Sequence, residues 1–260
     1  MFLEFQKFQG AGNDFVVLDN RDGAYSAISR QDVSRLTDRK FGIGADGLIL
    51  MNTSLSNDFE MDFYNPDGSK SFCGNGARCA ISYAMHNGFD MIHQRFMAID
   101  GLHDYRLEDH LIAVKMQDVS AIYHLSDTSG YVHTGSPHYI MFANDLSSEN
   151  VLQLGRQIRF SEEYAQEGVN VNLIMAQGND TLDIATYERG VENETLSCGT
   201  GATACALYYA DLQRFNLDNL KVKTKGGELK IYFKRSPQNG FTDVWLRGPA
   251  KWVFSGNVEL

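Results

Sequence analysis

Apolar and polar side chains alternate along several short stretches of this chain. Residues 59–64 (FEMDFY) place an apolar side chain at every second position, the pattern of a strand with one buried face. Residues 182–187 repeat this alternation, and the turn Asn65-Pro66-Asp67-Gly68 ends the first strand. Further strands are predicted at Phe15–Asp19, Leu48–Met51, Leu111–Met116 and Val169–Met175, and a hairpin pairs Lys221–Thr224 with Leu229–Phe233 through Gly226-Gly227.

Helical patterns are fewer. One helix is predicted over Arg30–Lys40, where Ser29 and Asp32 are spaced as in a capping box, and another over Ser148–Arg159. Two more follow Cys73 and Cys198, and the first of these ends near Gly88. Because strands outnumber helices, we predict an α+β architecture with a strongly curved sheet around a central helix in each half.

The two cysteine-led helices begin with nearly the same sequence. Residues 73–77 and 198–202 both read C-G-x-G-A, and a glycine-containing turn leads into an apolar run at residues 12–18 and at 135–141. The turn and the cysteine are 61 residues apart in the first half and 63 in the second. We infer a duplicated domain of about 120 residues, with a boundary near 115–120, whose pseudo-twofold symmetry makes the CGxGA turns face one another.

Composition and charge exclude several classes of protein. Apolar residues make up 43% and charged residues 22%, as in a folded globular protein. The formal charge of −10 has the wrong sign for neutralising phosphates, so nucleic acid is not an expected partner. No apolar run of about 18 residues suggests a membrane span, and the first residues lack the apolar core of a signal peptide. We therefore expect a cytoplasmic location.

The four cysteines do not form a metal-binding pattern. Cys73 and Cys79 are six positions apart and Cys198 and Cys205 seven, whereas paired zinc ligands usually have about two to four residues between them. The seven histidines are scattered, with no H-E-x-x-H motif. We expect neither a metal nor a cofactor.

A cysteine at the start of a helix is suited to acid–base chemistry. Unpaired backbone N–H groups and the helix dipole favour its thiolate, and the glycines that follow let a carboxylate approach the backbone. Two such cysteines, Cys73 and Cys198, predict two thiols on opposite sides of one carbon: one removes a proton and the other returns it, which inverts a stereocentre. Cys79 and Cys205, farther along their helices, are expected to be buried core residues.

Other motifs support competing functions less well. Residues 42–47 match G-x-G-x-x-G, but they precede an apolar run instead of opening a helix, which disfavours dinucleotide binding. A cysteine protease would use one nucleophile with a dedicated histidine partner and leaves the second cysteine unexplained. Glu188 and Arg189 are either a solvated surface pair or part of the site, and their place ten residues before Cys198 favours the site.

Along its full length the chain resembles the diaminopimelate epimerases. The resemblance rests on GAGNDF at 10–15, NPDGS and CGNGARC within 65–79, GSPH at 135–138, GVNVN at 168–172, and YERG and ETLSCGTGA within 187–202. It implies two mirrored barrel-like domains with a cleft between them, and a final strand, Trp252–Leu260, that returns to the first domain. The expected domains are residues 1–117 with 250–260, and residues 118–249.

The resemblance also implies an activity. It is the interconversion of LL- and meso-diaminopimelate, independent of pyridoxal phosphate, in the biosynthesis of lysine and cell-wall precursors. Cys73 and Cys198 are implied to be the acid–base pair. The sequence leaves the oligomeric state open, with a homodimer as one alternative. The implied substrate-binding residues are Asn13, Asn65, Gly74, Asn75, Ser136, His138, Asn170, Glu188, Arg189, Gly199 and Thr200.

Three departures from the family pattern concern binding rather than the cysteines. Ser136 stands where many members have asparagine, Gly47 where some have glutamine, and residues 191–194 form a stretch one residue longer than usual. Two alternatives also stay open. One is a proline or hydroxyproline racemase, although such enzymes usually carry histidine where this chain has Asn75. The other is a protein that binds an amino acid without converting it.

Overall fold

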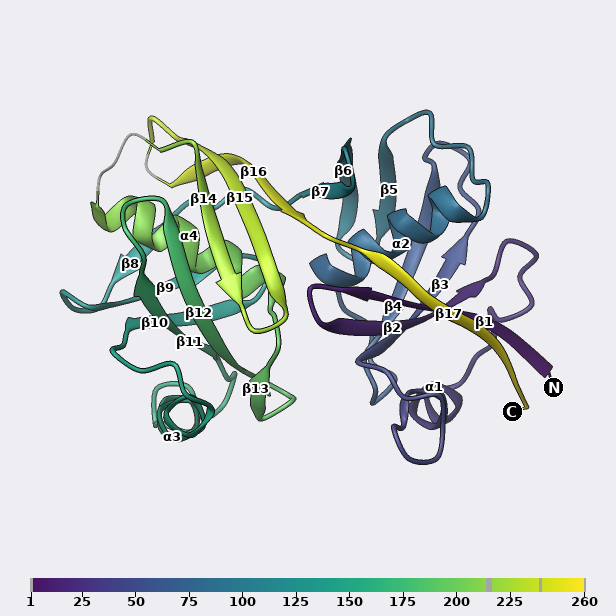
Figure 1. The fold of residues 1–260 in the computed structure, drawn as a ribbon, viewed down its shortest axis with the longest axis horizontal. Coiled ribbons are helices and arrows are strands. Elements are labelled where there is room, and N and C mark those ends of the chain that lie inside the picture. The colour runs from purple at the N-terminus through teal and green to yellow at the C-terminus, as the bar shows by residue number, and fades with distance from the viewer. Residues whose placement is uncertain (1, 214–216, 239, 260) are drawn as a thin grey trace. The chain divides into compact units, whose positions relative to one another are not determined.

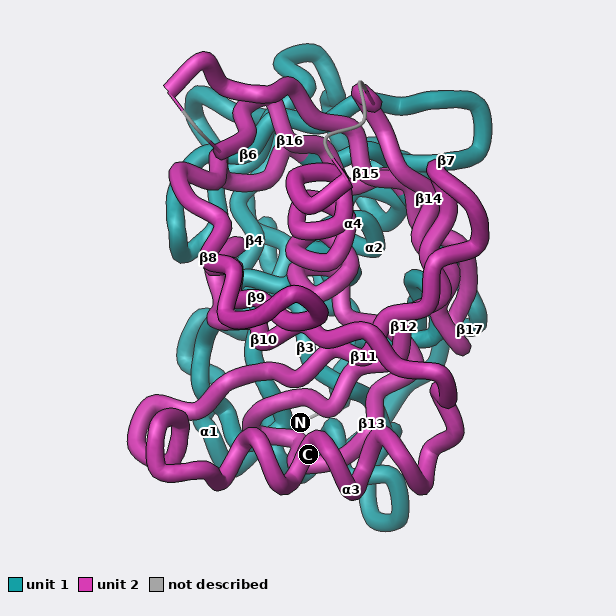
Figure 2. Tube along the Cα trace, turned by 90° about the vertical axis from the view of Figure 1, so that its left-hand side faces the viewer, with its two compact units in different colours: residues 1–114, 248–260 teal, residues 115–247 magenta. Residues whose placement is uncertain are grey.

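The chain folds into two compact units that are described separately here. The computed structural model describes residues 2–213, 217–238 and 240–259, which contain seventeen strands and four helices. Unit 1 comprises Met1–Val114 together with Gly248–Leu260, and unit 2 comprises Lys115–Arg247 (Figure 2).

Unit 1 is built on one sheet with the strand order β17-β1-β2-β3-β4-β5-β6-β7. The pairings are antiparallel except for β2 with β3 and β4 with β5, which are parallel. Its elements are β1 (Phe2–Gly10), β2 (Asn13–Asp19), α1 (Arg30–Thr37), β3 (Gly47–Asn52), β4 (Phe59–Tyr64), α2 (Gly74–His86), β5 (Arg95–Ala98), β6 (Gly101–Glu108), β7 (Leu111–Lys115) and β17 (Lys251–Glu259).

Unit 2 repeats this topology. Its parallel pairs are β10 with β11 and β12 with β14, again separated by antiparallel pairs, and its two helices occur at the corresponding points of the chain. The internal repeat therefore extends from the CGxGA segments to the order of strands and helices. The elements are β8 (Ile122–His124), β9 (Ser129–His133), β10 (Pro137–Phe142), α3 (Ser148–Arg159), β11 (Asn170–Ala176), β12 (Thr181–Glu188), β13 (Asn193–Thr195), α4 (Gly199–Gln213), β14 (Asn219–Thr224), β15 (Gly227–Arg235) and β16 (Phe241–Gly248).

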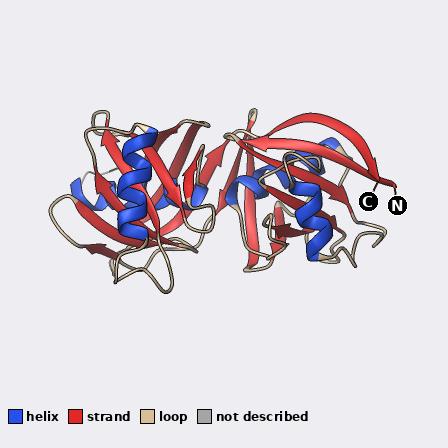
Figure 3. Cartoon of the chain, turned by 90° about the horizontal axis from the view of Figure 1, so that it is seen from below, coloured by secondary structure: helices blue, strands red, loops and turns tan. Residues whose placement is uncertain are grey.

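Helices α2 and α4 form the centres of their units. Ten of the 13 residues of α2 and eleven of the 15 residues of α4 are buried, as expected for a helix enclosed by strands on all sides. Helix α2 packs against β1–β4 and β17, and α4 packs against β8–β12, β14 and β15 (Figures 1 and 3). The predicted architecture, a curved sheet around a central helix in each half, is confirmed.

The outer face of each sheet carries the second helix of the unit. Val33 and Leu36 of α1 pack with Val16 and Leu48 on the face of the sheet away from α2, and Val151 of α3 packs in the corresponding way in unit 2. With helices on both faces, strand β3 is buried along nearly its whole length. This explains why its sequence is an apolar run and not an alternating one.

Some predicted element ends are wrong. Helix α1 has the predicted capping box of Ser29 and Asp32, but it ends at Thr37 and not at Lys40. The Asp38 carboxylate accepts hydrogen bonds from the backbone N–H groups of Lys40 (2.7 Å) and Phe41 (2.8 Å), and these bonds form a turn in place of another helical turn. Helix α3 has the predicted bounds.

No strand was predicted from the sequence for β1, β5, β6, β8, β9, β13 and β16, and β10 was indicated only as an apolar run. Most of the predicted strands differ from the observed ones by one or two residues at an end. The strand expected over Trp252–Leu260 is β17, Lys251–Glu259, and Leu260 lies outside the described residues. It pairs antiparallel with β1, from Phe2 with Glu259 to Gln9 with Lys251, so the two ends of the chain run side by side in Figure 1. Among the described residues, no helix is long and apolar enough to cross a membrane.

Candidate active site

The implied site residues fall into two groups, one in each unit. The Cys73 half-site consists of Asn13, Asn65, Cys73, Gly74 and Asn75, and the Cys198 half-site consists of Ser136, His138, Asn170, Glu188, Arg189, Cys198, Gly199 and Thr200. The two cysteines stand at the N-termini of the central helices α2 and α4, and each group is described within its own unit.

Cys73 is the N-cap residue of α2. Its backbone is extended (φ −134°, ψ 112°), its carbonyl accepts from Ala77 N at 2.7 Å, and its Sγ accepts from Gly76 N at 3.4 Å. A sulfur in this position receives a hydrogen bond from a helix N–H group and lies at the positive end of the dipole. Both effects favour the thiolate. Cys73 is partly exposed as a residue.

A chain of hydrogen bonds fixes the two amides beside Cys73. Arg78 Nη2 donates to Asn75 Oδ1 at 2.7 Å, which leaves Asn75 Nδ2 to donate to Asn13 Oδ1. Asn13 Nδ2 in turn donates to Asp46 Oδ2 at 3.0 Å. Each amide is thereby held in one orientation, and Asn13 and Asn75 lie together at the end of α2.

Asp46 belongs to the glycine-containing segment 42–47, which precedes β3 as the sequence indicates. Arg39 donates to both Asp46 Oδ1 (2.6 Å) and Asp14 Oδ1 (2.7 Å), and Lys7 pairs with Asp14 at 2.8 Å. Burial raises the pKa of Asp14, but the bonds to Arg39 and Lys7 outweigh burial and hold the pKa below its usual value. The segment thus supports Asn13 through Asp46.

Asn65 has a local role in this structure. Its backbone N–H donates to Ser69 O at 2.8 Å, and its Nδ2 donates to Ser71 Oγ at 3.1 Å. These bonds close the turn after β4 and connect it to the segment that leads into Cys73. Asn65 joins the half-site through the segment before the cysteine.

Cys198 directly precedes α4, and its carbonyl accepts from Ala202 N at 2.8 Å, the counterpart of the bond made by Cys73. Its exposed fraction is only 8%. Its Sγ lies 3.4 Å from the hydroxyl of Thr200, which stands where the first unit has Asn75. A hydroxyl in this position can donate to a thiolate.

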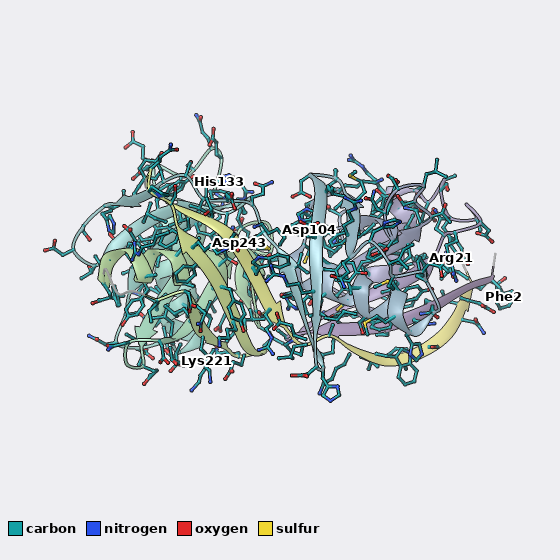
Figure 4. The ribbon with its side chains drawn as sticks, turned by 90° about the horizontal axis from the view of Figure 1, so that it is seen from above. Phe2, Arg21, Asp104, His133, Lys221 and Asp243 are labelled. Carbon is teal, nitrogen blue, oxygen red and sulfur yellow. The ribbon has the colours of Figure 1, made fainter. Side chains whose placement is uncertain are left out.

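His138 and Asn172 lie beside the start of α4. A Cβ placed on Gly201 would lie 2.6 Å from Asn172 Oδ1, so only glycine leaves room for this side chain next to the helix. His138 is fully buried, and its Nε2 has no hydrogen-bond partner among the described residues. Burial, with smaller contributions from His133 on the neighbouring strand (labelled in Figure 4) and Arg189, lowers the pKa of His138 to about 3. The imidazole is neutral at ordinary pH.

Asn170 links three segments of the Cys198 half-site. Its Nδ2 donates to Ser136 Oγ at 2.8 Å and to Pro137 O at 3.1 Å, and its Oδ1 accepts from the backbone N–H of Arg189 at 2.9 Å. Glu188 Oε2 accepts from Thr195 Oγ1 at 3.0 Å, and Arg189 Nη1 donates to Glu167 O at 2.7 Å. Each of these two side chains thus bonds within its own unit, and their role in the site stays a prediction.

The departures from the family pattern have visible structural consequences. A Cβ on Gly47 would lie 2.3 Å from Cε2 of Phe63, so the ring of Phe63 fills the space beside this residue. Ser136 bonds to Asn170, as described above. The longer stretch 191–194 is held by Glu192, whose carboxylate accepts from Gly190 N (3.1 Å) and Arg159 Nε (3.3 Å).

Cys79 and Cys205 are fully buried in the core, as predicted. Burial raises the pKa of both thiols, which makes them poor sources of thiolate.

The sequence alone assigned no role to Arg78, Asp46 or Asn172. The sequence feature that could have identified them is a polar residue in or beside an otherwise apolar segment. Within the described residues, no cluster of three His, Cys, Asp or Glu side chains could hold a metal ion.

Solved structures with this fold include a phenazine biosynthesis protein of the PhzF family from Bacillus anthracis, with a TM-score of 0.74, 12% identity and full coverage of both chains. A probable proline racemase from Agrobacterium radiobacter K84 has a TM-score of 0.71 and 13% identity, covering 99% of this chain and 93% of its own. At these identities the likeness defines the fold, which is that of the two-unit class containing PhzF proteins and proline racemases.

Sequence similarity is more specific than fold. The family model described as diaminopimelate epimerase matches residues 5–97 and 130–253. A diaminopimelate epimerase from Flavobacterium psychrophilum is 40% identical over 98% of this chain and 100% of its own length. The chain belongs to the diaminopimelate epimerase family.

Proposed function

We propose that this protein interconverts LL- and meso-diaminopimelate by proton transfer at the α-carbon, with Cys73 and Cys198 as the acid–base pair. The observation that carries the proposal is that both cysteines occupy the same position, directly before the first residue of a duplicated central helix, in a chain of this family. A second class of function is not needed, because the duplicated thiol has a use only where two proton transfers occur.

The chemistry balances without a cofactor. One cysteine, as the thiolate, takes the α-hydrogen as a proton and becomes a thiol, and the electron pair of the C–H bond delocalises into the substrate carboxylate. The other cysteine, as the thiol, delivers its proton to the opposite face of the carbon and becomes a thiolate. The backbone N–H groups of Gly74-Asn75 and Gly199-Thr200, at the N-termini of the two central helices, are the proposed hydrogen-bond donors to the substrate carboxylate. Negative charge develops on this carboxylate during the reaction.

The remaining implied residues fit the two ends of a diamino dicarboxylic acid. Arg189 suits the distal carboxylate because its planar guanidinium can donate to two oxygens, and Glu188 suits an ammonium group. Asn13, Asn65, Asn170 and Ser136 supply neutral donors and acceptors. His138 contributes a neutral imidazole whose unpartnered Nε2 can bond to substrate or thiol.

The decisive experiment is proton NMR of the reduced protein in D2O with LL- and meso-diaminopimelate, and with L-proline and hydroxyproline in parallel tubes. We expect loss of the α-proton signal together with isomer interconversion for diaminopimelate alone. Exchange with a proline-type substrate alone would keep the two-thiol chemistry and reject the substrate. Binding without exchange in any tube would make the protein an amino-acid binder.

The proposal includes the cellular setting that the family implies: a cytoplasmic enzyme of lysine and cell-wall precursor biosynthesis that works without pyridoxal phosphate. It also includes a homodimer. Support for the dimer comes from β17, where Trp252, Val253 and Phe254 are 48%, 47% and 43% exposed, an apolar surface suited to a second copy of the chain. Light scattering of the wild type and of Trp252→Glu tests this: a monomeric wild type rejects the dimer, and a dimer that persists in the variant rejects this surface.

A further inference from the structure

The turn after β12 carries Glu188 and Arg189, and it ends in a residue with a left-handed backbone. Glu192 has a φ of 55°, a conformation that costs more for a residue with a Cβ than for glycine. Its N–H donates to Glu188 O at 2.8 Å, and this bond closes the turn. A strained residue beside a candidate site points to a use for its side chain.

The Glu192 carboxylate holds the peptide group that follows Arg189. Its Oε1 accepts from Gly190 N at 3.1 Å, and on the other side Arg189 N donates to Asn170 Oδ1 at 2.9 Å. Side chains thus fix the backbone both before and after the Cα of Arg189. The direction in which the Arg189 side chain leaves the backbone follows from these two bonds.

Glu192 also reaches the turn that receives the guanidinium of Arg189. Its Oε1 accepts from Arg159 Nε at 3.3 Å, and Arg159 Nη1 donates to Tyr164 O, in the turn that precedes β11, at 3.3 Å. Farther along the same turn, Glu167 O accepts from Arg189 Nη1 at 2.7 Å. One carboxylate oxygen therefore connects the backbone of Arg189 with the segment that binds its side chain.

Gly168 leaves room for the two arginines. A Cβ placed on this glycine would lie 2.5 Å from Arg189 Cδ and 2.8 Å from Arg159 Cζ, so both side chains pass against it. Two cations that approach the same residue repel each other. Glu192 pairs with Arg159 and so offsets the repulsion that would push Arg189 away.

The bonds that fix Arg189 leave one edge of its guanidinium for a ligand. Within the described part of the chain, its side chain bonds through Nη1 and not through Nε or Nη2. The edge formed by Nε and Nη2 can donate two parallel hydrogen bonds to the two oxygens of a carboxylate. Arg189 is thus held from one side and open on the other.

We propose that Glu192 is a positioning residue that preorganises Arg189 to bind the second carboxylate of a diamino dicarboxylic acid. The identity of the ligand rests on the proposed function, whereas the placement of Arg189 rests on the contacts of Glu192. The paired side chains of Glu192 and Arg159 are 35% and 14% exposed, and ion pairs that are partly exposed add little to stability. The contribution of Glu192 is therefore to the position of Arg189.

The first test needs no substrate. Glu192→Gly removes the carboxylate at a position whose backbone suits glycine. Asp109→Gly is the matched control, because Asp109 also has a φ of 55° but lies in the exposed turn after β6. ¹⁵N relaxation of the arginine Nε–H groups, with the Arg189 signal assigned through Arg189→Lys, measures how firmly the guanidinium is held. We expect a rigid Arg189 in the wild type and in Asp109→Gly, and a mobile one in Glu192→Gly. Equal mobility in all three proteins overturns the proposal.

The second test is the division of the effect between KM and kcat for diaminopimelate. Glu192→Gly should raise KM about tenfold and change kcat less than about twofold, because a preorganised contact made in both ground state and transition state affects binding alone. Glu192→Gln keeps an oxygen that can accept from Gly190 N and should recover most of the loss. A purely structural role would lower the melting temperature without moving KM, and that result rejects the proposal.

A second ion pair near the same turn controls for general loosening. Lys225→Met breaks the pair between Lys225 and Glu194 (2.7 Å) and should leave KM unchanged. A rise in KM equal to that of Glu192→Gly would show that any loosening of this region weakens binding, and would reject a specific role for Glu192. If the wild type does not convert diaminopimelate, the proposed function fails, and the relaxation experiment still decides whether Glu192 fixes Arg189.

Discussion

Asn172 donates its side-chain amide to Nδ1 of His138 across 3.2 Å and to the backbone carbonyl of Tyr139 across 3.0 Å. Its Oδ1 accepts from Thr186 Oγ1 at 3.0 Å, so the orientation of the amide is settled by its neighbours. His138 Nδ1 is therefore an acceptor, and the proton of the neutral ring is on Nε2. The bond from Asn172 thus leaves Nε2–H of His138 as a buried hydrogen-bond donor.

The first prediction concerns the stability of the protein in acid. The pKa of His138 is lowered to about 3, whereas an unfolded histidine takes up a proton near pH 6.5. As the pH falls between these values, the unfolded state gains a proton that the native state does not, so the native state loses up to about 1.4 kcal/mol per pH unit. Denaturant unfolding from about pH 8 to pH 4 should show His138→Gln losing less stability than the wild type. Parallel curves would contradict the burial of a neutral imidazole.

A second prediction separates proton removal from inversion. Cys198→Ala keeps one thiol, so it should exchange the α-proton of one diaminopimelate isomer in D2O but lose epimerisation by about 100-fold or more. Cys73→Ala should exchange the other isomer. Cys205→Ala removes a buried thiol of the same helix as Cys198 and should keep turnover. If either site variant epimerises at the wild-type rate, two thiols are not required.

A third prediction uses the two equivalent glycines as a matched pair. A Cβ on Gly201 would meet Asn172 Oδ1 at 2.6 Å, whereas the atom nearest to a Cβ on Gly76 would be Cys73 Cβ at 3.4 Å, an ordinary contact. Gly201→Ala must displace Asn172 from Thr186 and His138, which should cost about 1–3 kcal/mol of folding free energy. Gly76→Ala should cost clearly less. Equal losses in melting experiments would show that Asn172 moves freely.

A fourth prediction concerns Gly47. Because its Cβ position is 2.3 Å from the ring of Phe63, restoring a larger residue there should destabilise unit 1 by about 1–3 kcal/mol rather than add a substrate contact. A double-mutant cycle with Phe63→Ala checks this. The two changes together should cost less than the sum of the single changes. If the two losses of stability simply add, the Phe63 ring moves aside without strain when residue 47 is enlarged.

Local signals explain which elements were predictable. The start of α1 was predicted because Ser29 and Asp32 form the capping box within four residues of sequence. Its end was not, because Asp38 acts through two backbone bonds that only the folded turn brings about. Strand β1 alternates irregularly, with a register shift between Lys7 and Phe8, so its pattern was hidden until its pairing with β17 was known.

The candidate site shows the same division. The cysteines were identifiable because a repeated C-G-x-G-A at helix starts has a chemical meaning in the sequence itself. Asp46 and Asn172 act by orienting Asn13 and His138, and those contacts join residues 33 or 34 positions apart. No period or motif encodes such contacts. Whether the implied substrate-binding residues contact diaminopimelate stays a prediction.

The pairing of β17 with β1 gives the two half-sites different histories during synthesis. Unit 2 is a continuous segment, whereas unit 1 consists of Met1–Val114 and Gly248–Leu260. The strand that pairs with β1, and Pro249, whose carbonyl accepts from Arg78, are the last parts of the chain to be made. Unit 1 therefore cannot be completed before the whole sequence of unit 2 has been synthesised, although most of unit 1 is made first. The Cys73 half-site takes its final form only when the two ends of the chain have paired.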